Sequence, residues 1–155
     1  MQYINVTIEL LKTYSSSKSM KELLALAIWF KMQHSNSVIW NVTEYKLRKG
    51  LRIGKVKAER LIRDMKESSL FSVEGNKVVV SSFRDHTTKW TRKGKEYRGG
   101  MVCKFEVKEY TMKELYNLIN EKLFVYPICA AEHKDCCLKA SDDGKIGAKG
   151  KVITI

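Results

Sequence analysis

The chain has 155 residues, of which 44% are hydrophobic and 30% are charged, and its 29 Lys and Arg against 17 Asp and Glu give a formal net charge of +12. This length fits one domain or two small ones and excludes a large multidomain enzyme. The apolar content excludes wholesale disorder. The longest apolar run, residues 23–30, is too short to cross a membrane. The N-terminus lacks the features of a signal peptide, so we expect a cytoplasmic protein.

The positive charge is concentrated in two segments. Residues 43–66 hold nine basic and three acidic side chains, and residues 84–104 hold seven and two. The two segments cover less than a third of the chain but carry +11 of its +12 charges. A surface that only keeps a protein in solution would spread this charge. We therefore expect a polyanionic partner to contact both segments.

The first half of the chain is predicted to hold one strand and three helices. Alternation and helical spacing of apolar residues place the strand at 2–8 and the helices at 20–34, 44–51 and 55–68. Ser19 and Glu22 have the spacing of a capping box, and Thr43 is the expected N-cap of the next helix. Between these helices, Ile39 and Trp40 are expected to anchor a connector in the core.

The second half is predicted to begin with a β-hairpin and to end in a tail. The expected elements are a hairpin at 71–80, a mobile basic loop at 84–100, a strand at 101–107 that pairs with the N-terminal strand, a helix at 111–125 and a flexible tail at 141–155. Gly75 and Asn76 mark the hairpin turn. Thr111 and Glu114 have capping-box spacing, and Pro127 is expected to end the helix.

The third helix has one apolar and one basic face. On a helical wheel, the apolar side chains that share a narrow arc are Ala58, Leu61, Ile62 and Met65. The opposite arc holds Val56, Arg60 and Arg63. This pattern predicts a helix that packs one face on a core and presents its arginines outward.

Together with its neighbours, this helix resembles the helix-turn-helix of winged-helix DNA-binding proteins. The resemblance has no gap from residue 42 to residue 71, and the matching apolar positions are Leu47, Leu51, Ile53, Ala58, Leu61, Ile62, Met65 and Leu70. Arg48 and Arg52 depart from the pattern, since the family usually has a small buried residue and often a glycine there. In the family a β-hairpin, called the wing, follows the helix-turn-helix. With the wing included, the resemblance covers residues 20–82.

The resemblance implies an α+β fold in which three helices and a wing form the DNA-binding unit. The expected parts are an N-terminal strand and winged-helix domain at 1–83, a basic loop at 84–100, a strand and helical extension at 101–140, and the tail at 141–155. In this fold the helix at 54–67 would lie in the major groove with its N-terminal residues near base edges.

Candidate DNA contacts follow from the same resemblance. Arg60 and Glu59 are the best candidates for reading bases, because Arg can bond guanine and Glu can accept from cytosine. The lysines are expected to neutralise phosphates, and the wing would meet the backbone or the minor groove. The full set in this unit is Arg48, Lys49, Arg52, Lys55, Lys57, Glu59, Arg60, Arg63, Asn76 and Lys77.

The second basic segment interleaves cations with aromatic residues. Its candidate contacts are Lys89, Trp90, Arg92, Lys93, Lys95 and Arg98. Such a mixture can follow phosphates and stack on unpaired bases. The alternative is that Trp90 and Tyr97 pack on the domain while the charges face water. Because the segment directly follows the wing, we expect it to extend the same binding surface.

The cysteines and acidic residues give no clear catalytic or metal site. Without a secretion signal, the four cysteines are expected to be reduced thiols. A group of potential zinc ligands consists of Cys129, His133, Cys136 and Cys137. Its adjacent cysteines cannot easily both reach one tetrahedral ion, so buried thiols are the favoured interpretation and we expect no cofactor. A phosphate-binding glycine loop, a nucleophile motif and paired carboxylates are all missing, which argues against an enzyme.

Two functions remain open at this stage. The first is a sequence-selective double-stranded DNA-binding protein, either a transcriptional regulator or a replication-initiator-like factor, of phage or mobile-element origin. The alternative is a structural or protein-interaction component, for instance encoded by a phage, that uses a winged-helix scaffold. The helix at 111–125 is either a homodimer interface or a cover for the sheet.

Overall fold

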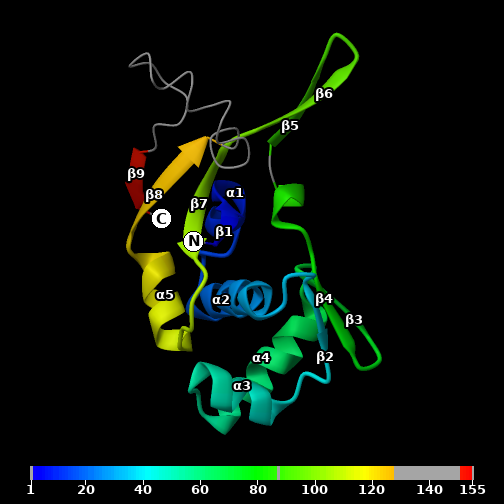
Figure 1. The fold of residues 1–155 in the computed structure, drawn as a ribbon, viewed down its shortest axis with the longest axis vertical. Coiled ribbons are helices and arrows are strands. Elements are labelled where there is room, and N and C mark those ends of the chain that lie inside the picture. The colour runs from blue at the N-terminus through cyan, green and yellow to red at the C-terminus, as the bar shows by residue number, and fades with distance from the viewer. Residues whose placement is uncertain (1, 87, 128–150, 155) are drawn as a thin grey trace.

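The computed structural model describes residues 2–86, 88–127 and 151–154, and their arrangement is shown in Figure 1. These residues form a mixture of helices and antiparallel strands, which confirms the expected α+β class. In chain order the elements are β1 (Tyr3–Thr7), α1 (Ile8–Thr13), α2 (Lys18–Gln33), β2 (Val38–Trp40), α3 (Glu44–Leu51), α4 (Lys55–Glu67), β3 (Phe71–Glu74), β4 (Lys77–Val80), the 3-10 helix η1 (Phe83–His86), β5 (Thr88–Arg92), β6 (Lys95–Gly99), β7 (Met101–Glu106), α5 (Met112–Asn120), β8 (Lys122–Pro127) and β9 (Lys151–Thr154).

A four-stranded antiparallel sheet brings together the N-terminal strand and the last described strands, in the order β1-β7-β8-β9. β1 lies against β7 with Tyr3 opposite Glu106 and Thr7 opposite Val102. This register confirms the predicted pairing of the N-terminal strand with residues 101–107. Thr7 also begins α1, because its side chain accepts a hydrogen bond from the backbone amide of Leu10.

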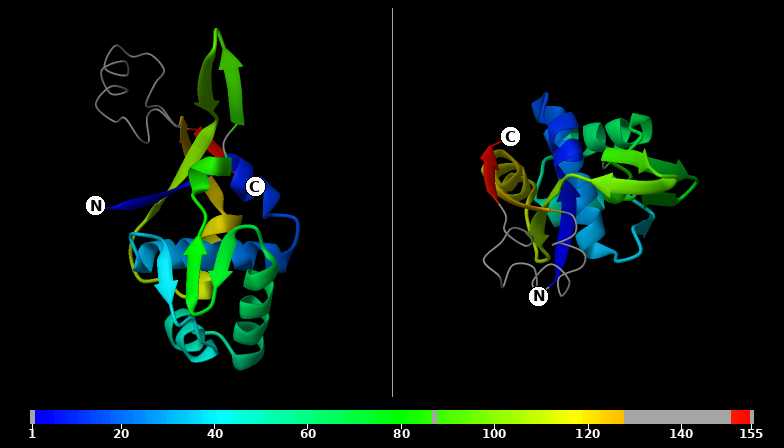
Figure 2. Two further views of the ribbon diagram at one scale, coloured as in Figure 1. Left: turned by 90° about the vertical axis from the view of Figure 1, so that its right-hand side faces the viewer. Right: turned by 90° about the horizontal axis from the view of Figure 1, so that it is seen from above.

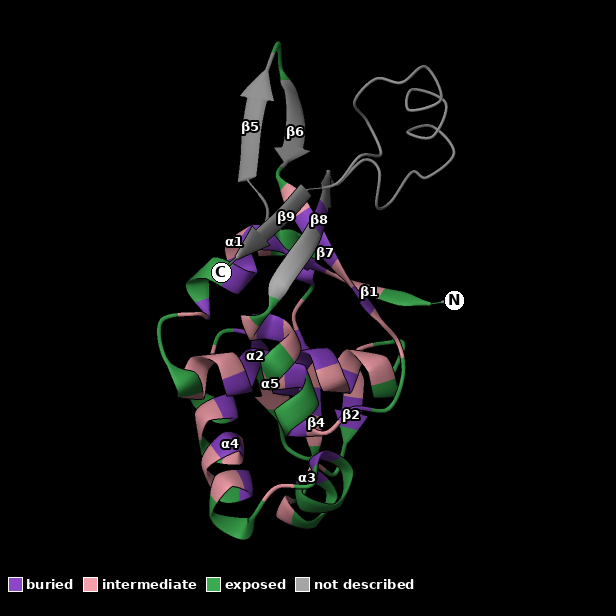
Figure 3. Ribbon diagram, turned by 90° about the vertical axis from the view of Figure 1, so that its left-hand side faces the viewer, coloured by how far each residue is buried: buried purple, intermediate pink, exposed green. Residues whose placement is uncertain are grey.

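α2 runs through the middle of the molecule and is buried on nearly every side (Figure 3). It begins earlier than predicted, since Ser17 is the residue whose side chain accepts from the backbone amide of Met20. The expected capping box of Ser19 and Glu22 is therefore wrong. All residues from 22 to 28 are buried, because four elements pack around α2, namely β1, α4, β4 and α5.

The segment from α2 to β4 builds the second sheet, with strand order β2-β4-β3. Thr43 caps α3 as predicted, and the predicted hairpin of β3 and β4 turns at Gly75, which has a φ of +58°. Ile39 is buried in this sheet, but Trp40 is 59% exposed. Its prediction as a core anchor is wrong because successive strand residues face opposite sides of a sheet.

The C-terminal predictions need two corrections. α5 has the predicted capping box of Thr111 and Glu114 but ends at Asn120, and residues 122–127 form β8 instead of the end of a helix. The Leu-Phe-Val-Tyr run favours an extended backbone, and β7 and β9 supply partners on both edges. Within the predicted tail, residues 151–154 are a strand, while residues 141–150 lie outside the described part of the chain.

The segment predicted as a mobile loop, residues 84–100, also has regular structure. Residues 84–86 belong to η1. Residues 88–99 form an antiparallel hairpin of β5 and β6, which we call the ribbon. The ribbon turns at Lys93 and Gly94, whose φ values of +52° and +76° are those that a two-residue hairpin turn needs. Figure 2 shows that the ribbon projects from the body of the protein.

Candidate nucleic-acid interface

α4 is positioned by an apolar stripe and presents charged side chains on its other faces. Ala58, Leu61 and Met65 are buried, as the wheel predicted. On the outside, Val56 is 81% exposed. The charged exposed residues of α4 are Lys55, Glu59, Arg63, Lys66 and Glu67. Among the described residues, Lys55, Arg63 and Lys66 form no ion pair, so their charges are available to a partner.

Two of the cations expected on the outer face of α4 instead hold the helix on α2. Lys57 Nζ lies 2.8 Å from Glu22 Oε2, and Arg60 Nη2 donates to Glu22 Oε1 at 2.7 Å. Glu22 itself is only 1% exposed. The prediction that Arg60 faces away from the core is therefore wrong, because the wheel of one helix cannot include a carboxylate on another.

The paired cations determine the ionisation of Glu22. Burial acts to raise the pKa of its carboxyl group. Hydrogen bonds from Lys57 and Arg60, together with their positive charges, outweigh burial and hold the pKa of Glu22 below its usual value of 4.5. The carboxylate is therefore charged at neutral pH and fixes the orientation of α4 on α2.

α3 adds a second set of exposed cations, interleaved with aromatic rings. Lys46 Nζ donates to the backbone carbonyl of Trp40 at 3.2 Å. Lys49 Nζ lies 5.8 Å from the centre of the Tyr45 ring, and Tyr45 is itself exposed. Arg48 is exposed at 42% of its side chain, but its Nε bonds the Glu44 carboxylate at 2.6 Å. The Arg48 charge is thus partly neutralised within α3.

The turn between α3 and α4 joins two helices that pack against each other. Arg52 has a φ of +54°, in the left-handed region of backbone conformation that favours glycine. Gly54 then caps α4 without a side-chain hydrogen bond. α3 also packs so close to α2 that a Cβ atom on Gly50 would overlap the Trp29 ring. We call the exposed cations of α3, of α4 and of the turn between them the basic helix face, except Arg48, which is paired with Glu44; they are Lys46, Lys49, Arg52, Lys55, Arg63 and Lys66.

The hairpin of β3 and β4 stands beside this face. Asn76 at its tip is exposed, and its backbone carbonyl accepts from the Asn41 amide at 2.8 Å. Lys77 Nζ lies 3.7 Å from Glu74. A shallow pocket of about 220 Å³ separates the hairpin from α4, and its lining includes Val42, Ile62, Lys66 and Gly75.

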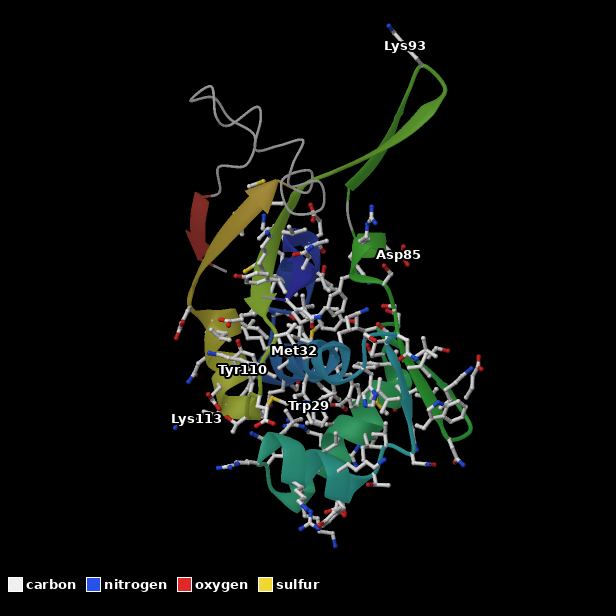
Figure 4. All side chains as sticks on the ribbon, viewed as in Figure 1. Trp29, Met32, Asp85, Lys93, Tyr110 and Lys113 are labelled. Carbon is white, nitrogen blue, oxygen red and sulfur yellow. The ribbon has the colours of Figure 1, made fainter. Side chains whose placement is uncertain are left out.

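The ribbon lies apart from the basic helix face. Figures 1 and 2 show it at the opposite end of the long axis from α3 and α4, and Figure 4 places Lys93 at its outer tip. Its expected contribution to the same binding surface stays a prediction. Of the predicted contacts here, Lys93 is exposed. The backbone register is described for the others, Lys89, Trp90, Arg92, Lys95 and Arg98, but their side chains are not.

Sequence reasoning missed four residues of the helix surface: Trp40, Tyr45, Lys46 and Lys66. The exposure of Trp40 could have been predicted from a strand at this position, since adjacent strand residues such as Ile39 and Trp40 face opposite sides of a sheet. Lys66 lies three residues after Arg63, so the two side chains are neighbours on the helix surface. Tyr45 and Lys46 lie in the first turn of α3, where exposure depends on the tertiary packing.

The described residues contain no group of three or more His, Cys, Asp or Glu side chains placed to hold a metal ion. The candidate zinc ligands Cys129, His133, Cys136 and Cys137 lie outside the described part of the chain. Burial raises the pKa of the Cys103 thiol to about 12, so this thiol stays protonated at neutral pH. None of the helices in the described ranges has the length and hydropathy that a bilayer span requires.

Comparison with known proteins gives no family for the chain. No family model matches the sequence, and neither a curated protein nor a solved structure matches it significantly.

Proposed function

We propose that the chain binds duplex DNA through a winged helix-turn-helix made by α2, α3, α4 and the sheet β2-β4-β3. The observation that carries this proposal is the basic helix face, which consists of exposed cations on two helices that pack against each other. Among them Lys55, Arg63 and Lys66 of α4 form no ion pair in the described part of the chain. Three helices followed by a β-hairpin is the order expected from the resemblance in sequence, and β2, predicted as a connector, adds a third strand to the hairpin. A concentrated positive surface of this kind favours a polyanion over an uncharged partner.

In this proposal the residues of α4 have two different roles. Arg63 and Glu59 are exposed and have the chemistry to bond base edges in the major groove. Lys55 and Lys66 neutralise phosphates on either side. Lys57 and Arg60 retain partial exposure but act mainly through Glu22, which fixes the angle at which α4 meets DNA. Asn76 and Lys77 of the hairpin would contact the backbone or the minor groove.

The dependence of binding on salt tests the phosphate contacts. We expect affinity for random duplex DNA to fall steeply with salt, because bound lysines release condensed counterions. Replacing Lys55 and Lys66 together by Ala should flatten the slope of log affinity against log salt by about 1.8, or about 0.9 per contact. The control replaces Lys12 and Lys108, which are exposed on α1 and before α5. Equal effects of both double variants would refute a defined interface.

Selectivity is tested at Arg63. On a site selected from a randomised duplex library, Arg63→Ala should weaken binding by about 1–3 kcal/mol, since one base contact is lost. Its affinity for random duplexes should change far less. The comparison variant is Arg60→Ala, which we expect to lower thermal stability as well, because it removes a partner of Glu22. Loss of selectivity from Arg60→Ala at unchanged stability would assign base reading to Arg60 instead.

A protein partner is the second candidate, favoured by the exposed apolar side chains near this face. Trp40 and Tyr45 are both more than half exposed, and Val56 still more so. Aromatic residues are typical anchors of protein interfaces. If the double lysine variant and the wild-type chain bind duplexes equally weakly at all salt concentrations, this second function replaces the first. The choice between a regulator and a replication-initiator-like factor then no longer arises.

A further inference from the structure

A pocket of about 360 Å³ lies where α2, α5 and the turn between α3 and α4 come together. Its lining comes from elements far apart in the sequence, because it includes Lys18 at the start of α2, Lys57 of α4 and Lys113 of α5. Figure 4 places Lys113 at the end of α5 that lies toward α3. The volume is at the small end of the range for small-molecule sites, so the pocket has the size for a small metabolite.

The lining of this pocket is strongly positive. Its cationic side chains are Lys18, Arg52, Lys57 and Lys113, and Glu22 is the one acidic residue among the lining residues described, so four cations against one carboxylate give a net charge of +3. Within the described ranges, Lys18, Arg52 and Lys113 form no ion pair. Such a concentration of charge favours a dianion over a single carboxylate. A phosphomonoester carries about −1.5 to −2 charges at neutral pH.

Lys57 is held in place at this pocket by a buried carboxylate. Its Nζ lies 2.8 Å from Oε2 of Glu22, which is 1% exposed, while the Lys57 side chain itself remains 36% exposed. An ammonium group has three donors, so one bond to Glu22 leaves two for a ligand. A donor that is fixed before binding loses less conformational entropy when the ligand arrives. The ion pair therefore gives the pocket a preorganised cation.

Apolar and aromatic side chains complete the lining. Met112 is buried, and Ile53 and Tyr116 are half-buried. Ligand sites typically combine an apolar lining with a few charged groups that fix the orientation of the ligand. The lining therefore fits a phosphate group attached to an apolar or aromatic body better than it fits free phosphate. Gly54, the N-cap of α4, also lines the pocket, and the positive end of that helix dipole adds to the attraction for an anion.

We propose that this pocket binds a small phosphomonoester with an apolar or aromatic body, and that the bound ligand weakens the contact with DNA. The regulation rests on the proposed function, whereas binding of the ligand does not. Arg52 belongs both to the pocket and to the basic helix face, and Lys57 lies in the first turn of α4. A phosphate beside Arg52 neutralises one attraction for the DNA backbone and adds negative charge next to α4. By linkage, bound DNA weakens the ligand by the same factor.

Calorimetry without DNA tests the pocket. Phenyl phosphate, inorganic phosphate and benzoate are each titrated into the full chain. We expect one phenyl phosphate to bind per chain, more tightly than inorganic phosphate, which lacks the aromatic body, and than benzoate, which carries a single charge. Replacing Lys18 and Lys113 together by Ala should weaken phenyl phosphate about tenfold or more, because charge-assisted bonds to phosphate are lost. The control variant replaces Lys12 and Lys108, which remove the same charge outside the pocket, and should bind phenyl phosphate like the wild type.

Duplex binding in the presence of phenyl phosphate tests the regulation. Saturating phenyl phosphate should weaken the affinity of the full chain for a random duplex about fivefold or more, whereas sodium chloride of equal ionic strength should weaken it less. The variant that lacks Lys18 and Lys113 should bind the duplex as well as the variant that lacks Lys12 and Lys108. It should lose the response to phenyl phosphate, which the control variant should keep.

The other outcomes overturn defined parts of the proposal. If no probe binds at millimolar concentration, or if both double variants weaken phenyl phosphate equally, the pocket is refuted as a ligand site, and the proposed function stands wherever the chain still binds duplexes. If inorganic phosphate binds as tightly as phenyl phosphate, the apolar body is refuted.

Two further results separate the pocket from the proposed function. If phenyl phosphate binds but leaves duplex affinity unchanged, the regulation is refuted, and if the chain binds phenyl phosphate but no duplex, the proposed function fails as well while the ligand site stands. If the loss of Lys18 and Lys113 weakens duplex binding and the free chain binds none of the probes, these lysines hold the phosphates of DNA itself. That result would overturn the proposal and leave the proposed function intact.

Discussion

Glu22 is the residue on which the contact between α2 and α4 depends. Its carboxylate is buried, while its partners Lys57 and Arg60 come from the second helix and remain partly exposed. A buried charge is tolerated only when it is paired and hydrogen-bonded. Sequence reasoning could find the basic residues of α4 but not their partner, because Glu22 and Arg60 are 38 positions apart.

We predict that Glu22→Gln lowers the free energy of unfolding by about 1–3 kcal/mol, since charged hydrogen bonds are lost while Lys57 and Arg60 can still reach water. The control is Glu59→Gln, which removes the same charge from an exposed site on α4 and should change stability far less. Urea denaturation measures both. A similar loss in the two variants would mean that the ion pairs with Glu22 contribute little.

We also predict that the difference in unfolding free energy between the wild-type chain and Glu22→Gln depends on pH. The pKa of Glu22 is lower in the folded protein than the usual value of 4.5. The stabilisation is therefore fully present above the unfolded pKa and is lost as the pH falls through the folded one. The difference in unfolding free energy between wild type and Glu22→Gln should stay constant near neutral pH and shrink below about pH 4.5.

At the scale of elements, caps, apolar stripes and turn residues in the sequence predicted those helices and hairpins that local interactions determine. α3, α4 and the hairpin of β3 and β4 were predicted from a cap at Thr43, an apolar stripe and a turn at Gly75, all within a few residues of the structure they specify. β8 and the ribbon were missed. Their strands depend on pairing with residues that the sequence does not identify, such as Val125 opposite Cys103.

α4 offers a direct test of its assigned faces. Leu61 is fully buried, whereas Val56 on the same helix is 81% exposed. Leu61→Ala should lower the free energy of unfolding by about 2–5 kcal/mol through lost contacts and a cavity. Val56→Ala should change it by less than about 0.5 kcal/mol, as for an exposed surface substitution. Thermal or urea unfolding of the two variants measures the contrast, and equal effects would show that the helix is rotated from the position described.

For the molecule as a whole, one hydrophobic cluster of the described chain contains buried residues from the two larger sheets and from all five α-helices. α2 is its centre, because it contacts α4 and β4 as well as α5 and β1. The sequence predicted a separate unit at residues 1–83, since the resemblance to winged-helix proteins ends at residue 82. The apolar run within α2 carries no information about which later element covers its remaining side.

We therefore predict that a chain ending at residue 83 does not unfold cooperatively. It lacks α5, whose Met112, Leu115 and Ile119 are buried. Each such side chain contributes about 1.5–3 kcal/mol when buried, and a domain of this size has only about 5–15 kcal/mol in total. The exposed face of α2 should then bind a hydrophobic dye, and calorimetry should show a weak, broad transition. A chain ending at residue 121 keeps α5 and β7, so it should retain a sharp transition at lower temperature than the full chain. If the chain ending at residue 83 were as stable as the full chain, its helices and wing would form an independent domain, and the contact of α2 with α5 would be a docking of two separate units.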